Sequence, residues 1–167
     1  MGCRSCELAC ALAHSAAEDL ASLVASDERP GHSISVEACG KQAVPVHCNH
    51  CEDAPCVLAC PTGAMHREKP DGPVTLDTAK CIGCSMCVQA CPFGVLTVRR
   101  GGRGVLKCDL CIERLAKGLE PACVAACPTK ALVFCEEEEV VKTKRRQAAE
   151  RLVSAQERGE TETDNGE

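Results

Sequence analysis

Seventeen of the 167 residues are cysteine, and fifteen of them fall into four closely spaced groups. A cysteine share of about ten per cent is several times that of an ordinary protein. Groups of this kind restrict the fold, because each one must close into a tight loop. The four groups are Cys3/Cys6/Cys10, Cys48/Cys51/Cys56/Cys60-Pro61, Cys81/Cys84/Cys87/Cys91-Pro92 and Cys108/Cys111/Cys123/Cys127-Pro128.

The groups form an internal repeat that continues beyond the cysteines. Three of them end in Cys-Pro and run into similar segments, residues 61–65, 92–96 and 128–132. Each of these segments predicts a turn that leads into a short strand. We also expect short helices over residues 85–90 and 122–126, each of which the following proline stops.

Local patterns predict further short elements between and after the groups. Apolar and polar residues alternate from Ile34 to Ala38, which is typical of a strand. Gly101-Gly102 lies between two apolar segments and predicts a hairpin. The other expected elements are a strand over 74–76, hairpin strands over 95–99 and 104–107, a helix over 109–118 and a strand over 131–134.

The charge distribution divides the chain after Cys135. Residues 136–167 hold ten acidic and six basic side chains, whereas residues 1–135 hold all the cysteines and are nearly neutral. Glu138 lies four residues before Lys142, an order that supports a helix. We expect a cysteine-rich domain over 1–135, a charged helix over 136–156 and a disordered tail over 157–167. The helix is interpreted as a solvated surface element, with a docking arm for a partner as the alternative.

Composition excludes several classes of protein. No apolar run reaches the eighteen residues that a membrane-spanning helix needs. There is no secretory or twin-arginine signal, so we expect a cytoplasmic location, at most peripheral to a membrane complex. The net charge of −5 argues against a nucleic-acid surface. In a reducing compartment, this many cysteines indicates metal or redox sites rather than disulfides.

The third group has a spacing that is specific for one kind of site. Cys81, Cys84, Cys87 and Cys91 follow the Cys-x2-Cys-x2-Cys-x3-Cys-Pro pattern of a bacterial ferredoxin, which binds a [4Fe–4S] cluster. Three cysteines two residues apart on a tight loop can surround one side of the cubane. The fourth lies a helical turn further on and points toward another cluster. Zinc and disulfides are the alternatives, but they do not explain the triplet, the offset cysteine and the proline together.

Several segments resemble the four-cluster ferredoxin subunits of carbon monoxide dehydrogenase, formate hydrogenlyase, formate dehydrogenases and the dimethyl sulfoxide reductase class. Residues 2–10 most resemble the carbon monoxide dehydrogenase type. The resemblance covers residues 1–135. It implies an α+β fold of tandem ferredoxin-like dicluster repeats with pseudo-twofold symmetry, in which short strands and helices surround the clusters. The segments that carry it are 48–56 (Cys-Asn-His-Cys-Glu-Asp-Ala-Pro-Cys), 80–84 (Lys-Cys-Ile-Gly-Cys), 107–111 (Lys-Cys-Asp-Leu-Cys) and 121–123 (Pro-Ala-Cys).

The resemblance also implies how the cysteines are shared among four clusters. Copies exchange ligands in pairs, the inner two with each other and the outer two with each other. The implied first set is Cys48, Cys51, Cys56 and Cys91, and the second set is Cys60, Cys81, Cys84 and Cys87. The third set is Cys10, Cys108, Cys111 and Cys123, and the fourth set is Cys3, Cys6 and Cys127 with one ligand missing.

Three explanations are open for the missing ligand. In the first, the sequence starts too late, as a fragment or from a wrongly chosen start, because family copies carry another cysteine at the place just before Met1. In the second, the site is a three-cysteine [3Fe–4S] centre. In the third explanation, Cys39 supplies the ligand. Otherwise we expect Cys39 and Cys135 to be small buried apolar residues, and His47 and His50 to hydrogen bond or lie at the surface.

Together these features predict an electron-transfer subunit with no substrate site of its own. We expect it to carry single electrons through four [4Fe–4S] clusters, three of them with complete ligand sets. Its partners would be a catalytic oxidoreductase subunit, of carbon monoxide dehydrogenase, formate dehydrogenase or hydrogenase type, and a second redox protein. A catalytic subunit is disfavoured because no cofactor or nucleophile motif is present. A structural zinc-binding interaction module is the alternative.

Overall fold

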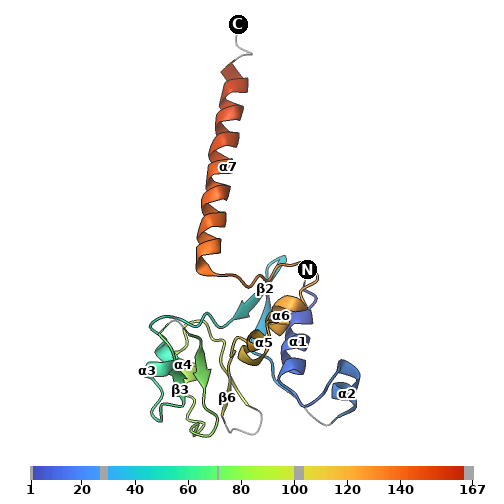
Figure 1. Cartoon of the computed structure of the whole chain (residues 1–167), viewed down its shortest axis with the longest axis vertical. Helices are drawn as coiled ribbons and strands as arrows, with labels where there is room; N and C mark the ends of the chain where they lie inside the picture. Colours follow the sequence, from blue (N-terminus) through green and yellow to red (C-terminus); the bar gives the residue numbers. More distant parts are fainter. Residues whose placement is uncertain (1, 27–29, 71, 100–103, 164–167) are drawn as a thin grey trace. The chain divides into compact units, whose positions relative to one another are not determined.

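The computed structural model describes residues 2–26, 30–70, 72–99 and 104–163. The chain divides into two compact units, Met1–Leu132 and Val133–Glu167 (Figure 1). The division falls close to the boundary expected after Cys135. Every cysteine of the four groups belongs to the first unit.

Three antiparallel hairpins supply all the strands found in the described part of the first unit. The strand expected over 74–76 is present and pairs with residues 65–67. The hairpin expected around residue 101 is also present, although residues 100–103 of its turn lie outside the described residues. The hairpins are β1 (Ile34–Cys39) with β2 (Gln42–His47), β3 (Met65–Arg67) with β4 (Val74–Leu76), and β5 (Thr97–Val98) with β6 (Val105–Leu106).

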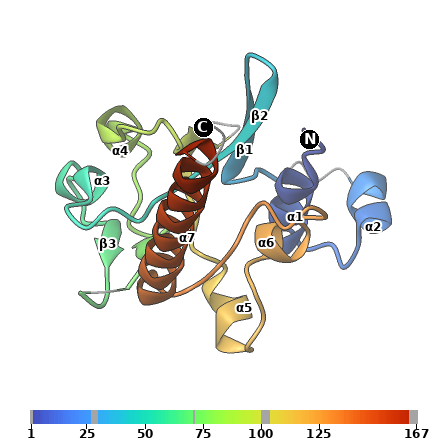
Figure 2. The ribbon, with the colours of Figure 1, turned by 90° about the horizontal axis from the view of Figure 1, so that it is seen from above.

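The helices of the first unit are short, and four of them carry cysteines of the groups. Both the helix expected over 85–90 and that expected over 122–126 are present within a residue of their expected bounds. Helices α1 and α6 pack side by side, as Figures 1 and 2 both show. The helices are α1 (Ser5–Ala13), α2 (Leu20–Ala25), α3 (Pro55–Leu58), α4 (Met86–Ala90), α5 (Ile112–Ala116) and α6 (Ala122–Ala125).

Two small apolar clusters form the core, and each contains cysteines. Met65, Val74 and Val105 are each only 1% exposed and join the β3–β4 hairpin to β6. The second cluster joins α1 to β1 through Cys6, Cys10, Ile34 and Val36. The two phenylalanines, Phe93 and Phe134, are exposed and contribute little to either cluster.

Two expectations differ from the structure at the end of the cysteine-rich domain and beyond it. Residues 131–134 form no strand, since no strand of the described residues pairs with them. Helix α7 runs over Glu137–Thr163 and so continues past residue 156, where the helix was expected to end. Residues 164–167 of the expected disordered tail lie outside the described residues. Among the described residues, no helix is both long and apolar enough to cross a membrane.

Candidate metal centre

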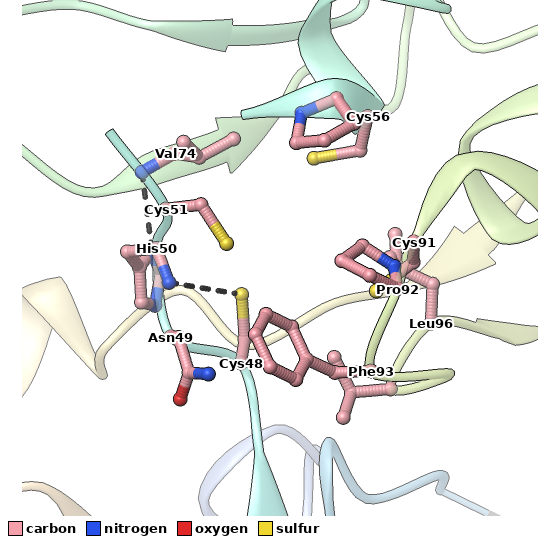
Figure 3. Close-up of a pocket in the computed structure, with 12 residues that line it drawn as sticks. Cys48, Asn49, His50, Cys51, Cys56, Val74, Cys91, Pro92, Phe93 and Leu96 are labelled. Atoms are coloured by element: carbon pink, nitrogen blue, oxygen red, sulfur yellow. Dashed lines mark hydrogen bonds between the residues drawn. The ribbon is translucent and has the colours of Figure 1, made fainter. Parts of the chain in front are cut away.

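The four cysteines of the first set line one pocket. Cys48, Cys51 and Cys56 come from the loop before α3 and from its first turn, and Cys91 comes from the end of α4. Figure 3 shows the three loop cysteines around a common space, with Cys91 on its other side. Cysteines of two groups of the repeat therefore line one pocket.

The loop of the first set is held by hydrogen bonds to its backbone. The His50 N–H donates to Cys48 Sγ at 3.4 Å, and Nδ1 of the same histidine accepts from Val74 N–H at 3.1 Å (Figure 3). Arg67 Nη2 donates to the carbonyl oxygens of His50 at 2.9 Å and of Cys51 at 2.5 Å. These contacts fix the loop against the β3–β4 hairpin.

The four cysteines of the second set line a second pocket. Cys60 approaches from the end of α3, while Cys81, Cys84 and Cys87 surround the other side. Cys60 Sγ accepts a hydrogen bond from the Met65 N–H at 3.4 Å. Burial raises the pKa of Cys87, and the neighbouring thiols of Cys56 and Cys60 raise it further. The first and second pockets are therefore adjacent.

The third set lies where α1, α6 and the loop before α5 meet. Burial raises the pKa of Cys123 to about 11, and the neighbouring Cys10 and Cys111 thiols add to the rise. Burial also raises the pKa of Cys108 to about 12, with a smaller contribution from the Cys48 thiol of the first set. The structure thus brings Cys10, Cys111 and Cys123 together and places Cys108 beside the first pocket.

A histidine joins the two sides of the third set. His14, just after α1, contacts Asp109 with its Nε2 3.1 Å from Oδ1, and its Nδ1 lies 2.8 Å from the Cys10 carbonyl oxygen. Possible ligand atoms of His14, Asp109 and Cys111 all lie within 4.8 Å of one another. The hydrogen bond that His14 donates to Asp109 raises the pKa of His14 to about 11, which favours an ion pair across the site. This pair joins α1 to the loop that carries Cys108 and Cys111.

The fourth set lies at the other end of the α1–α6 pair. Hydrogen bonds from Ser5 lower the pKa of Cys3, against a small opposing effect of the Cys127 thiol. Burial raises the pKa of Cys6, and the neighbouring Cys3 thiol raises it further. Hydrogen bonds led by the Leu132 N–H lower the pKa of Cys127. Cys3, Cys6 and Cys127 are thus neighbours, and Cys3 is exposed.

The groups share backbone geometry as well as sequence. The third residue after Cys60, Cys91 and Cys127 has a positive φ in each case, 64° at Gly63, 62° at Gly94 and 53° at Lys130. Each of these residues donates its N–H to the carbonyl of the preceding cysteine at 3.2–3.3 Å. Three copies of the repeat therefore make the same turn after their last cysteine.

The donor set fits an iron–sulfur cluster. Thiolates are the soft ligands that such clusters use, and four of them line each of the first two pockets. Sulfur atoms of Cys10, Cys48, Cys60 and Cys108 each accept a backbone N–H at 3.3–3.4 Å. Such donors stabilise thiolates and tune the reduction potential of a bound cluster.

The expectation for the two remaining cysteines was wrong. Both Cys39 and Cys135 are exposed rather than buried. Cys39 ends β1 opposite Gln42, at the tip of the first hairpin. Cys135 lies between the end of the first unit and α7. The histidine expectation holds, because His47 is exposed and His50 is hydrogen bonded.

Sequence reasoning missed four charged residues that hold the sites together. Arg67, Lys107 and His14 each contact the backbone or side chains of cysteine loops. Glu7 is buried in α1, and its Oε1 accepts the Val36 N–H at 2.6 Å. The only available signal was the recurrence of lysine directly before Cys81 and Cys108, which does not separate a buried lysine from an exposed one.

Comparisons with known proteins agree with this geometry. An iron–sulfur protein of Rhodospirillum rubrum is 46% identical, over 79% of this chain and 75% of the relative. The electron transport protein HydN of Escherichia coli is 40% identical, over 89% and 91% respectively. The thiosulfate reductase electron transfer subunit PhsB of Salmonella typhi is 43% identical, over 80% and 69%. Residues 40–137 match the family model of the 4Fe-4S dicluster domain. With two cysteine-lined pockets inside that segment, the chain belongs to the 4Fe-4S dicluster domain family.

Proposed function

We propose that this chain carries single electrons between a catalytic oxidoreductase subunit and a second redox partner, through iron–sulfur clusters. The observation that carries the proposal is the pair of pockets lined by Cys48, Cys51, Cys56 and Cys91 and by Cys60, Cys81, Cys84 and Cys87. A [4Fe–4S] cluster, when bound, supplies one-electron redox chemistry. The protein contributes the ligands, their spacing and the electrostatics of the site.

The proposed ligands are the fifteen cysteines of the four sets. The first two sets are supported by their pockets, and the third and fourth by the mutual effects of their thiols. We assign three complete [4Fe–4S] sites to the first three sets. The fourth set has three cysteines, Cys3, Cys6 and Cys127, so its cluster is either of the [3Fe–4S] type or completed by a further ligand.

Contacts between sets support a linear order of sites. The second set meets the first through Cys87 and Cys56. The first set meets the third through Cys48 and Cys108. The third set meets the fourth along α1, which carries both Cys6 and Cys10. A line of redox sites of this kind suits single-electron transfer from one end to the other.

Exposure supports entry and exit at the two ends of this line. Among the fifteen proposed ligands only Cys84, in the second set, and Cys3, in the fourth set, are exposed. The cysteines of the first and third sets are buried or half-buried. Partners that dock beside Cys84 and Cys3 would therefore approach the two terminal sites rather than the central ones.

The repeated turns support a tandem dicluster architecture with pseudo-twofold symmetry. Equivalent turns follow Cys60 and Cys91, which end the two inner groups, and Cys127, which ends one of the outer groups. Cys60 and Cys127 also share a contact with a threonine two residues later, at 3.8 Å in both cases. We propose residues 1–135 as the four-cluster domain, with helix α7 (Glu137–Thr163) attached to it.

The names of relatives and the charge of the loaded protein support the class of partner. The relative PhsB is named as an electron transfer subunit of a thiosulfate reductase, and HydN as an electron transport protein. Each oxidised cube with four thiolates carries about −2, so loading makes the chain more acidic than its formal −5. We therefore expect partners with basic docking patches and an association that salt weakens.

Metal analysis of the anaerobically reconstituted chain tests the proposal. We expect about sixteen iron atoms per chain if all four sites hold cubanes, about fifteen if the fourth holds a [3Fe–4S] centre, and about twelve if the fourth site stays empty. Zinc without iron, and no absorbance near about 400 nm, would support the zinc-binding module instead. Cys84→Ala should lower the iron content by one cluster and slow electron transfer, while Cys135→Ala, at an exposed cysteine outside the four sets, should leave both unchanged.

A further inference from the structure

Lys107 links the first and third sets through its ammonium group. The residue follows β6, precedes Cys108 and is half-buried. Its Nζ donates to the carbonyl oxygen of Val74 at 2.5 Å and to that of Cys108 at 2.8 Å, and it lies 3.5 Å from His50 Nδ1. These acceptors come from three segments, and each belongs to a cysteine set or lines its pocket.

The lysine also fixes the orientation of the His50 ring. Both the Lys107 ammonium and the Val74 N–H donate to Nδ1, so the ring proton must lie on Nε2. Nε2 is buried and has no hydrogen-bond partner among the described residues, and the histidine lines the first pocket. A buried donor without a protein partner is costly, and a sulfur ligand bound in the pocket would be a suitable acceptor.

The contacts of Lys107 place its charge beside both sets. The ammonium approaches His50 and the Val74 carbonyl, which line the first pocket, and it donates to the carbonyl of Cys108, a proposed ligand of the third set. A fixed cation in half-buried surroundings is screened less than one in water.

Lys80 provides a matched comparison within the same chain. It directly precedes Cys81, as Lys107 directly precedes Cys108. Its side chain is 63% exposed, and its Nζ lies 3.2 Å from Asp77 Oδ2. The charge of Lys80 is therefore largely neutralised by an acid and by solvent, whereas that of Lys107 faces two backbone carbonyls and an imidazole.

We propose that Lys107 is a positioning residue whose half-buried charge makes the clusters of the first and third sets easier to reduce. The proposal rests on the proposed function, because it requires those sets to bind clusters. Reduction adds a negative charge to a site, and a fixed cation beside it stabilises the reduced form. The two central sites of the line then share one cation.

Potentiometric titration of the anaerobic, fully loaded chain, followed by electron paramagnetic resonance, tests this inference. In Lys107→Gln, which retains a donor but loses the charge, we expect the reduced-to-oxidised ratio at a fixed potential to fall about tenfold for two clusters. That change corresponds to about 59 mV for a one-electron couple. The second-set signal, identified as the one that Cys84→Ala removes, should stay in place.

Two control variants separate charge from packing. Lys107→Arg retains the charge, and Lys80→Gln removes the exposed counterpart, so both should keep the ratios within about threefold of the starting protein. Iron loss from Lys107→Gln that is confined to the first and third sets would also support the link between them. Unchanged potentials at full iron content, an equal shift in Lys80→Gln, or iron loss from all sets would overturn the inference. If the starting protein bound no clusters, the proposed function itself would fail instead.

Discussion

Arg67 holds the loop of the first set through more hydrogen bonds than any other described side chain near that pocket. Its guanidinium donates to the carbonyl oxygens of His50, Cys51, Gly72 and Pro70, at distances between 2.5 and 3.1 Å. Arg67→Met keeps much of the aliphatic stem but removes every donor. The perturbation therefore tests whether this residue keeps the cysteine loop closed on the β3–β4 hairpin.

The size of the effect follows from the two loop carbonyls. A hydrogen bond from a charged donor contributes about 1.5–3 kcal/mol. The contact to Pro70 is exposed and Gly72 belongs to the hairpin itself, so only the bonds to His50 and Cys51 are counted. Because water can partly replace the donors, we expect the free energy of opening this loop to fall by about 3 kcal/mol. Such a change makes the open form about a hundredfold more populated.

Iron release under anaerobic conditions measures that opening. With an excess of an iron chelator, Arg67→Met should show a fast phase that carries about four iron atoms, the content of one cluster. The remaining iron should leave at the rate of the unsubstituted protein. Arg114→Met is the matched control, because Arg114 Nε donates to a single exposed carbonyl, that of Glu120, at 3.0 Å. Release from Arg67→Met at the unsubstituted rate, or an equal acceleration in Arg114→Met, would refute the role given to Arg67.

Three further substitutions test the packing around the sites. Glu7→Ala removes the buried acceptor of the Val36 N–H and should lower the free energy of unfolding by about 2–3 kcal/mol, as measured by anaerobic denaturant titration, with Glu7→Gln retaining most of it. Lys130→Gly removes the strain of a φ of 53° at a turn where Gly63 occupies the equivalent position. The free energy of unfolding should therefore rise by about 1 kcal/mol, seen as a higher denaturation midpoint, and a lower midpoint would contradict this. Met65→Ala, at a side chain that is 1% exposed, should cost about 2–5 kcal/mol in the same titration, and a loss below about 1 kcal/mol would show that the core tolerates the cavity.

The local structure around the cysteines could be predicted from the sequence because it depends on the spacing of nearby residues. A run such as that from Cys81 to Cys91 fixes a loop and one helical turn, and the structure has α4 at this place. The strand over 74–76 was readable for the same reason, since apolar residues lie between turn signals. The strand expected over 131–134 failed because a strand needs a partner, and the sequence of one segment does not show whether a partner is there.

The burial of the cysteines outside the four groups was harder to predict from the sequence. Cys39 was expected inside because free cysteine is commonly buried. In the structure it ends β1 opposite Gln42, at an exposed hairpin tip. The alternation from Ile34 to Ala38 located the strand correctly. Burial nevertheless decreases along the strand: Ile34 is 3% exposed, whereas the second half of the strand, next to the hairpin turn, is exposed. Which part of a strand is covered depends on α1, which packs against only one end.

The two lysines that precede cysteines show why electrostatics at the sites depends on tertiary structure. Lys80 follows a turn in which Asp77 accepts backbone N–H groups and pairs with the ammonium, so its local sequence already neutralises the charge. Lys107 directly follows strand β6, in which Val105 is buried. Because Val105 packs into the core, the lysine two residues later lies close enough to donate to the carbonyl of Val74, which is 33 residues away in sequence. Identical dipeptides therefore place one cation in solvent and the other between two cysteine sets. If the clusters of those sets share that cation, the small core around Val105 determines redox behaviour as well as stability.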